Sequence, residues 1–183
     1  ATSNDARANY FQKLGNSGLA DVEAVEIDWF TEAMQYSDLL APVADDLKGR
    51  WLDWKEAAAT DAAGNLIAYG TDIGPQGICY RADLMEKAGF PTDREEVAAL
   101  LEGDWDNYFS VGKDYVAKSG GVAWFDSASA TFQGMVNQVE NPFENSDGTP
   151  IPLSENAEIK GIYDQIATAA VDDGLSAGLA QWT

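Results

Sequence analysis

The segment ICYRADLMEKAGFP, residues 78–91, joins a short apolar run to a helical pattern with a clear end. Residues 78–80 are apolar or aromatic and predict a strand, in which the thiol of Cys79 is expected to be buried. Residues 82–88 predict a helix that Gly89 and then Pro91 terminate, in the order typical of helix ends. A strand followed directly by a helix is the unit from which α/β folds are built.

The same alternation continues on both sides of this segment. Further strands are predicted by period-2 alternation or short apolar runs at 21–27, 66–70 and 122–125. Further helices are predicted at 5–14, 29–36, 51–59, 105–119, 131–139 and 156–172, and another after a capping box of Thr92 and Glu95. This rhythm predicts an α/β fold with mostly parallel sheets flanked by helices.

Acidic, hydroxyl and aromatic residues follow the predicted strands. Asp28 and Trp29 follow 21–27, Asp72 follows 66–70, and residues 126–132 follow 122–125. Ligands of open α/β sheets bind at the carboxyl ends of strands. Carboxylates accept hydrogen bonds from sugar hydroxyls, and aromatic rings pack on the apolar faces of sugars. For Asp28, a helix cap remains an alternative role.

Residues 71–77 contain Gly74, Pro75 and Gly77 between two predicted strands. Proline lacks a backbone donor, and glycines weaken a strand, so a regular strand cannot easily continue here. The segment is a candidate hinge or crossover between two lobes, and an ordinary loop is the alternative.

Composition excludes several classes of function. The 183 residues include 31 acidic and 11 basic side chains, and the formal charge of −20 repels nucleic acids and anionic lipids. Histidine is absent from the chain, which removes Ser/His and Cys/His nucleophile pairs and His-containing zinc sites. Nucleotide-binding glycine motifs are also absent, so we expect no cofactor and no metal.

Two other classes of function remain open. A glycoside hydrolase needs only two suitably spaced carboxylates, which an acidic chain can supply, although nothing singles out a pair. A structural interaction protein would instead present a large apolar surface patch and no polar cleft.

The chain resembles the middle of a family 1 extracellular solute-binding protein, the family that includes maltodextrin receptors. The resemblance runs in order through 21–28, 64–72, 78–91 and the Trp105–Asp106 pair, and 78–91 is its most specific part. It implies a two-lobed, type II periplasmic-binding-protein-like fold that is incomplete here, because family members are about twice as long. It also implies capture of a ligand without chemistry, so that the protein is not an enzyme.

The resemblance also implies roles for individual residues. Residues 1–72 would belong to lobe 1, 73–76 would form the hinge, and 77–183 would belong to lobe 2. The expected hinge residues are Ile73, Gly74, Pro75 and Gln76. The expected ligand-binding residues are Asp28, Trp29, Asp72, Ser127, Ser129, Phe132 and Trp182.

Finer details, such as CYR at 79–81 and DGLSA at 173–177, resemble an actinobacterial subgroup associated with cellobiose. They imply an oligosaccharide ligand, ABC permease subunits as partners and a monomer that is periplasmic or lipid-anchored at the cell surface. Residues 1–5 do not resemble a signal peptide, so any targeting segment is expected outside this sequence.

Overall fold

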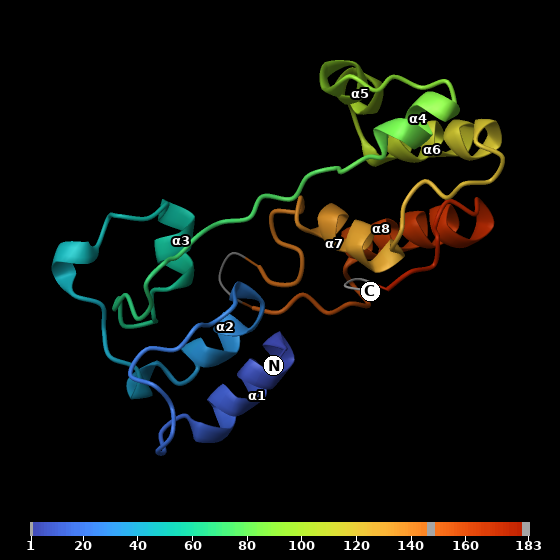
Figure 1. Ribbon diagram of the computed structural model, residues 1–183. Coiled ribbons are helices and arrows are strands. Elements are labelled where there is room, and N and C mark those ends of the chain that lie inside the picture. The colour runs from blue at the N-terminus through green and yellow to red at the C-terminus, as the bar shows by residue number, and fades with distance from the viewer. Residues whose placement is uncertain (1, 146–148, 181–183) are drawn as a thin grey trace. The chain divides into compact units, whose positions relative to one another are not determined.

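The computed structural model describes residues 2–145 and 149–180, apart from the side chain of Asp28. The chain divides into two compact units, Ala1–Gly74 and Pro75–Thr183. The boundary lies within the segment 73–76 that the sequence suggests as a hinge, and the hinge role stays a prediction. Within each described unit, helices are the main regular structure (Figure 1).

The described residues of the first unit form five helical segments. They are α1 (Ser3–Lys13), α2 (Ile27–Met34), the 3-10 turns η1 (Ser37–Leu39) and η2 (Asp45–Leu47), and α3 (Asp53–Ala58). A capping box begins α1, because the Thr2 hydroxyl accepts from the Asp5 N–H and the Asp5 carboxylate accepts from the Thr2 N–H.

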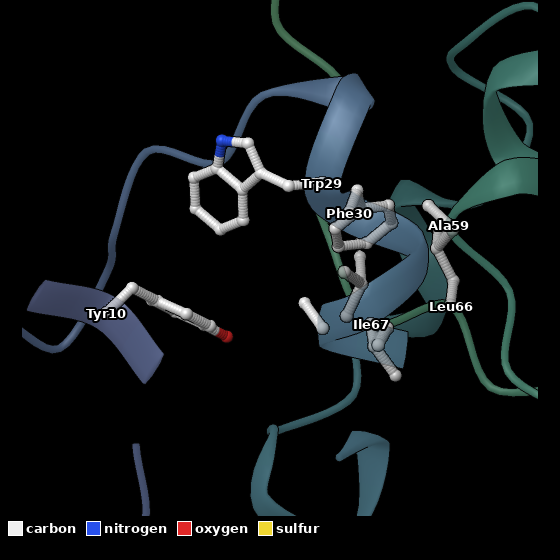
Figure 2. Packing of buried hydrophobic residues seen from close by; sticks show 8 residues of the cluster. Tyr10, Trp29, Phe30, Ala59, Leu66 and Ile67 are labelled. Atoms are coloured by element: carbon white, nitrogen blue, oxygen red, sulfur yellow. The ribbon is translucent and has the colours of Figure 1, made fainter. Parts of the chain in front are cut away.

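Aromatic side chains connect α1 to α2 in the core of the first unit. The rings of Tyr10 and Trp29 lie 5.5 Å apart between centroids, and those of Phe11 and Trp29 lie 5.7 Å apart. Figure 2 shows Trp29 and Phe30 projecting from α2 among the buried residues of this cluster. The aromatic contacts therefore fix α2, and with it the chain segment that contains Asp28.

A tight turn after α3 lies between further residues of this core, Ala59 on one side and Leu66 and Ile67 on the other. The N–H of Ile67 donates to the Ala59 carbonyl at 2.9 Å, and Thr60 and Leu66 form an antiparallel bridge. The Asp61 carboxylate accepts from the N–H groups of Ala63 and Asn65, which closes the turn. The segment that leads to Asp72 leaves from this turn.

The second unit contains α4 (Ala82–Lys87), α5 (Arg94–Leu101), α6 (Trp105–Lys118), α7 (Ala128–Val136), α8 (Ala157–Ala167) and the π-helical segment η3 (Thr168–Asp172). One cluster joins α4 and α5 to α6 through Met85, Val97 and Tyr115. The other joins α6 to α7 and α8 through Phe109, Met135 and Ile166. Figure 1 shows α7 and α8 side by side.

Two extended segments run next to each other in the second unit. The Phe125 N–H donates to the Leu175 carbonyl at 3.1 Å, and the Ala177 N–H donates to the Phe125 carbonyl at 2.8 Å. This is a parallel bridge between Phe125 and Ser176. It positions Asp126 and the start of α7 directly after the buried ring of Phe125.

The predicted parallel sheets are not confirmed. Among the described residues, β pairing is limited to isolated bridges, and 21–27, 66–70, 78–80 and 122–125 form no ladder. Strand formation requires a neighbouring strand to satisfy the backbone groups. Without one, the apolar side chains of Val22 (76% exposed) and Ile78 (53% exposed) lie at the surface, and Cys79 is exposed, not buried.

Helix starts differ from the predictions where the caps differ. The predicted capping box of Thr92 and Glu95 is wrong, because Asp93 caps α5 by accepting from the N–H groups of Glu95 and Glu96. Helix α7 begins at Ala128, before the predicted residue 131, because the Ser127 hydroxyl accepts from the Ala130 N–H.

Candidate functional site

Asp72 lies in an exposed segment of the first unit that a neighbouring helix holds. The Asp72 carboxylate accepts a hydrogen bond from the Thr71 hydroxyl at 3.0 Å. Among the described residues, its second oxygen has no hydrogen-bond partner. An exposed carboxylate with one free oxygen can accept a hydrogen bond from a ligand hydroxyl.

Two side chains, one from α3 and one from just before it, contact the backbone of this segment. The Lys55 ammonium donates to the Asp72 carbonyl, and the Trp51 indole N–H donates to the Gly70 carbonyl at 2.7 Å. The Trp51 ring also meets the Tyr69 ring edge-on, with 6.2 Å between centroids. Sequence reasoning missed both roles and placed the two residues only within a helix predicted at 51–59.

Asp28 and Trp29 lie in the first turn of α2, not before it, because the helix begins at Ile27 with Glu26 as its cap residue. The side chain of Asp28 is outside the described part of the structure. Trp29 is only 7% exposed and packs against Tyr10 and Phe11. Its buried N–H has no acceptor among the described residues. Contact of either side chain with a ligand stays a prediction.

Ser127 is the N-cap residue of α7, and Ser129 and Phe132 lie within the helix. Ser127 is 2% exposed, and its hydroxyl lies 2.9 Å from that of Ser129, which is exposed. Phe132 is half-buried and meets Tyr163 of α8 edge-on at 6.3 Å. Ser127 therefore caps the helix in this structure, and contact of Ser127, Ser129 or Phe132 with a ligand stays a prediction. Trp182 lies outside the described residues.

Asp126 adds a carboxylate to this group. One of its oxygens accepts from the Ser127 N–H at 2.7 Å, and the side chain is exposed. The pKa of Tyr108 in α6 rises to about 12, first because the phenol is buried and second because Asp126 is negatively charged. The sequence shows that Asp126 follows residues 122–125, whereas nothing in the sequence indicates that Tyr108 is buried close enough to Asp126 to feel its charge.

A separate surface pocket of about 380 Å³ lies in the first unit. Its polar lining comes from Ser37, Asp38, Asp61 and Asn65, and it contains none of the residues predicted to bind a ligand. The pKa of Asp61 is lowered, mainly because the backbone N–H of Asn65 donates to it. That carboxylate therefore already serves the turn at 61–65.

The described part of the chain contains no group of three or more acidic or cysteine side chains arranged to hold a metal ion. Nor does any helix in 2–145 or 149–180 have the length and apolar character needed to cross a bilayer.

Comparison with known proteins gives a match among the solved structures. Neither a family model nor a curated protein matches the chain. A crystal structure described as "Extracellular solute-binding protein family 1" matches with a TM-score of 0.86 and 44% sequence identity, over 100% of this chain and 47% of that one. The chain thus spans about half the length of that relative. Throughout its length, it is similar in fold and sequence to part of a family 1 extracellular solute-binding protein.

Proposed function

We propose that the chain is part of a family 1 solute-binding receptor that captures an oligosaccharide and delivers it to an ABC importer. The observation that carries this proposal is 44% identity along the whole chain to a solute-binding protein. In this proposal the receptor is extracellular, either periplasmic or lipid-anchored, and works as a monomer with its permease.

The favoured ligand is a disaccharide similar to cellobiose. Its hydroxyls would donate to carboxylates of Asp28 and Asp72 in lobe 1, and Ser129 and Phe132 would contribute from lobe 2. Residues 73–76 would be the hinge. Contacts to both lobes stabilise a closed state, which is the form that would dock on the permease.

Hydrolysis of a glycoside is the alternative. It requires a carboxylic acid that stays protonated near neutral pH, and thus a raised pKa. Four described aspartates have shifted pKa values, all of them lowered, chiefly because neighbouring groups donate hydrogen bonds to the ionised form. They are Asp5, Asp45, Asp61 and Asp83. These four carboxylates therefore stay ionised near neutral pH and do not meet the requirement for the acid.

Calorimetric titration tests the proposal. The protein is expressed from its complete reading frame and titrated with cellobiose, xylobiose and maltose, beside an Asp72→Ala variant. We expect saturable binding of cellobiose that weakens about tenfold or more in the variant, because a charge-assisted hydrogen bond is lost. Absence of binding with all three sugars would refute the proposal.

A further inference from the structure

The segment 69–72 is extended and lies at the surface, yet two side chains hold its backbone. The Trp51 indole N–H binds the Gly70 carbonyl at 2.7 Å, and the Lys55 ammonium binds the Asp72 carbonyl. These carbonyls are two residues apart and accept no other hydrogen bond that the described structure shows. The contacts therefore fix the backbone directly before and at Asp72.

The indole ring of Trp51 lies very close to the Cα of Gly70. A Cβ atom at this glycine would lie 2.5 Å from Cδ1 and 2.8 Å from Nε1 of Trp51. Such distances are far below van der Waals contact, so only glycine allows the indole N–H to reach this carbonyl. The Tyr69 ring meets the indole edge-on, with 6.2 Å between centroids.

Lys55 reaches the segment from α3. Its side chain is half-buried and passes beside the Trp54 ring, with the ammonium 6.0 Å from the ring centroid. The ammonium binds the carbonyl of the same residue whose carboxylate accepts from Thr71. Lys55 thus anchors the backbone of Asp72 and leaves one carboxylate oxygen open.

We infer that Trp51 and Lys55 are positioning residues that clamp residues 70–72 and so hold the Asp72 carboxylate ready for a ligand hydroxyl. The inference rests on the proposed function, in which Asp72 accepts a hydrogen bond from the sugar. A side chain held in place before binding loses less conformational entropy when the ligand arrives. Affinity should therefore depend on groups that never touch the sugar.

The test combines variants of the clamp with a variant of Asp72 in the protein expressed from its complete reading frame. Trp51→Phe keeps a ring but removes the N–H donor, and Lys55→Met keeps the stem but removes the ammonium. We expect each to weaken cellobiose binding by roughly two- to tenfold, as for one lost hydrogen bond. Lys55→Arg should restore most of the affinity, because a guanidinium can donate to the same carbonyl.

A double-mutant cycle separates positioning from general stability. In an Asp72→Asn background, Lys55→Met and Trp51→Phe should cause little further loss of affinity. Leu52→Ala and Lys48→Met serve as controls, because Leu52 is exposed directly before the same helix and Lys48 pairs with Asp45 elsewhere. Three results would each overturn the inference. They are wild-type affinity in Trp51→Phe and Lys55→Met, an equal loss of affinity from these changes in the wild-type and Asp72→Asn proteins, and unchanged affinity in Asp72→Asn alone.

A second measurement needs no ligand. Chymotrypsin cleavage after Tyr69, which is 52% exposed, reports opening of the segment. We expect faster cleavage there in Trp51→Phe and Lys55→Met and unchanged cleavage in the two controls. If the wild-type protein binds no sugar, the proposed function fails. Cleavage after Tyr69 still tests whether Trp51 and Lys55 hold residues 70–72 in place. Equal cleavage rates at Tyr69 in all variants would overturn it.

Discussion

At the scale of single residues, the buried phenol of Tyr108 makes the stability of the folded state depend on pH. Its pKa of about 12 lies above the ordinary value of 10 because burial and then Asp126 disfavour the phenolate. The folded state keeps its proton at a pH where the unfolded state has lost it. The contribution of the buried Tyr108 phenol to the free energy of unfolding is therefore complete below pH 10 and is lost as the pH rises toward 12.

The corresponding prediction concerns Tyr108→Phe. Urea unfolding of the wild type should show stability falling between about pH 10 and pH 12 by up to roughly 3 kcal/mol from this group. The variant should lack that component, because it has no phenol to ionise. The same decline in both proteins would contradict the burial of Tyr108.

Two helical glycines offer a matched comparison. A Cβ at Gly112 in α6 would lie 2.5 Å from Cδ1 of Trp124, whereas at Gly161 in α8 no atom lies within 4 Å. We expect Gly112→Ala to destabilise the protein by about 1–3 kcal/mol through overpacking. Gly161→Ala should stabilise it by up to about 1 kcal/mol through helix propensity. Thermal unfolding measures both, and stabilisation by Gly112→Ala would show that Trp124 does not pack there.

At the scale of elements, helices were largely predictable and strands were not. A helix satisfies the hydrogen bonds of its own backbone, so local periodicity and caps were enough to predict the helix at 105–119. The structure has this helix at Trp105–Lys118. A strand depends on a distant partner, which local pattern cannot supply: residues 122–125 gained only the bridge of Phe125 to Ser176. The clamp on 70–72 was missed for the same reason, since Trp51 and Gly70 are 19 residues apart.

Asn156 illustrates how one side chain joins two elements. It is 8% exposed, its amide donates to the Pro142 carbonyl at 2.8 Å, and its oxygen accepts from the Ile159 N–H at the start of α8. Asn156→Ala should cost roughly 2–3 kcal/mol, because a cap is lost and a carbonyl loses its donor. Asp93→Ala, which removes an exposed cap only, should cost about 1 kcal/mol. Equal losses in chemical denaturation would contradict the second role of Asn156.

At the scale of the whole molecule, charge opposes compaction. A formal charge of −20 leaves many acidic side chains without a basic partner, and surface pairs such as Lys118 with Asp114 contribute little. Raising ionic strength from about 0.01 M to about 0.15 M shortens the screening length from about 30 Å to about 8 Å. The thermal midpoint should therefore rise with salt at pH 7.

The control for this prediction is a similar salt series near pH 4, where many carboxylates are protonated and the repulsion is smaller. A midpoint that falls with salt at pH 7, or rises equally at both pH values, would show that self-repulsion does not limit stability.

The central claim is that the protein captures a sugar and leaves it unchanged. Its most direct test is equilibrium dialysis of cellobiose against the protein expressed from its complete reading frame, followed by chromatography of the recovered sugar. We predict that the protein retains cellobiose in a saturable manner and that the sugar recovered after denaturation is intact disaccharide. Release of glucose, or no retention of cellobiose above a protein-free control, would contradict the account.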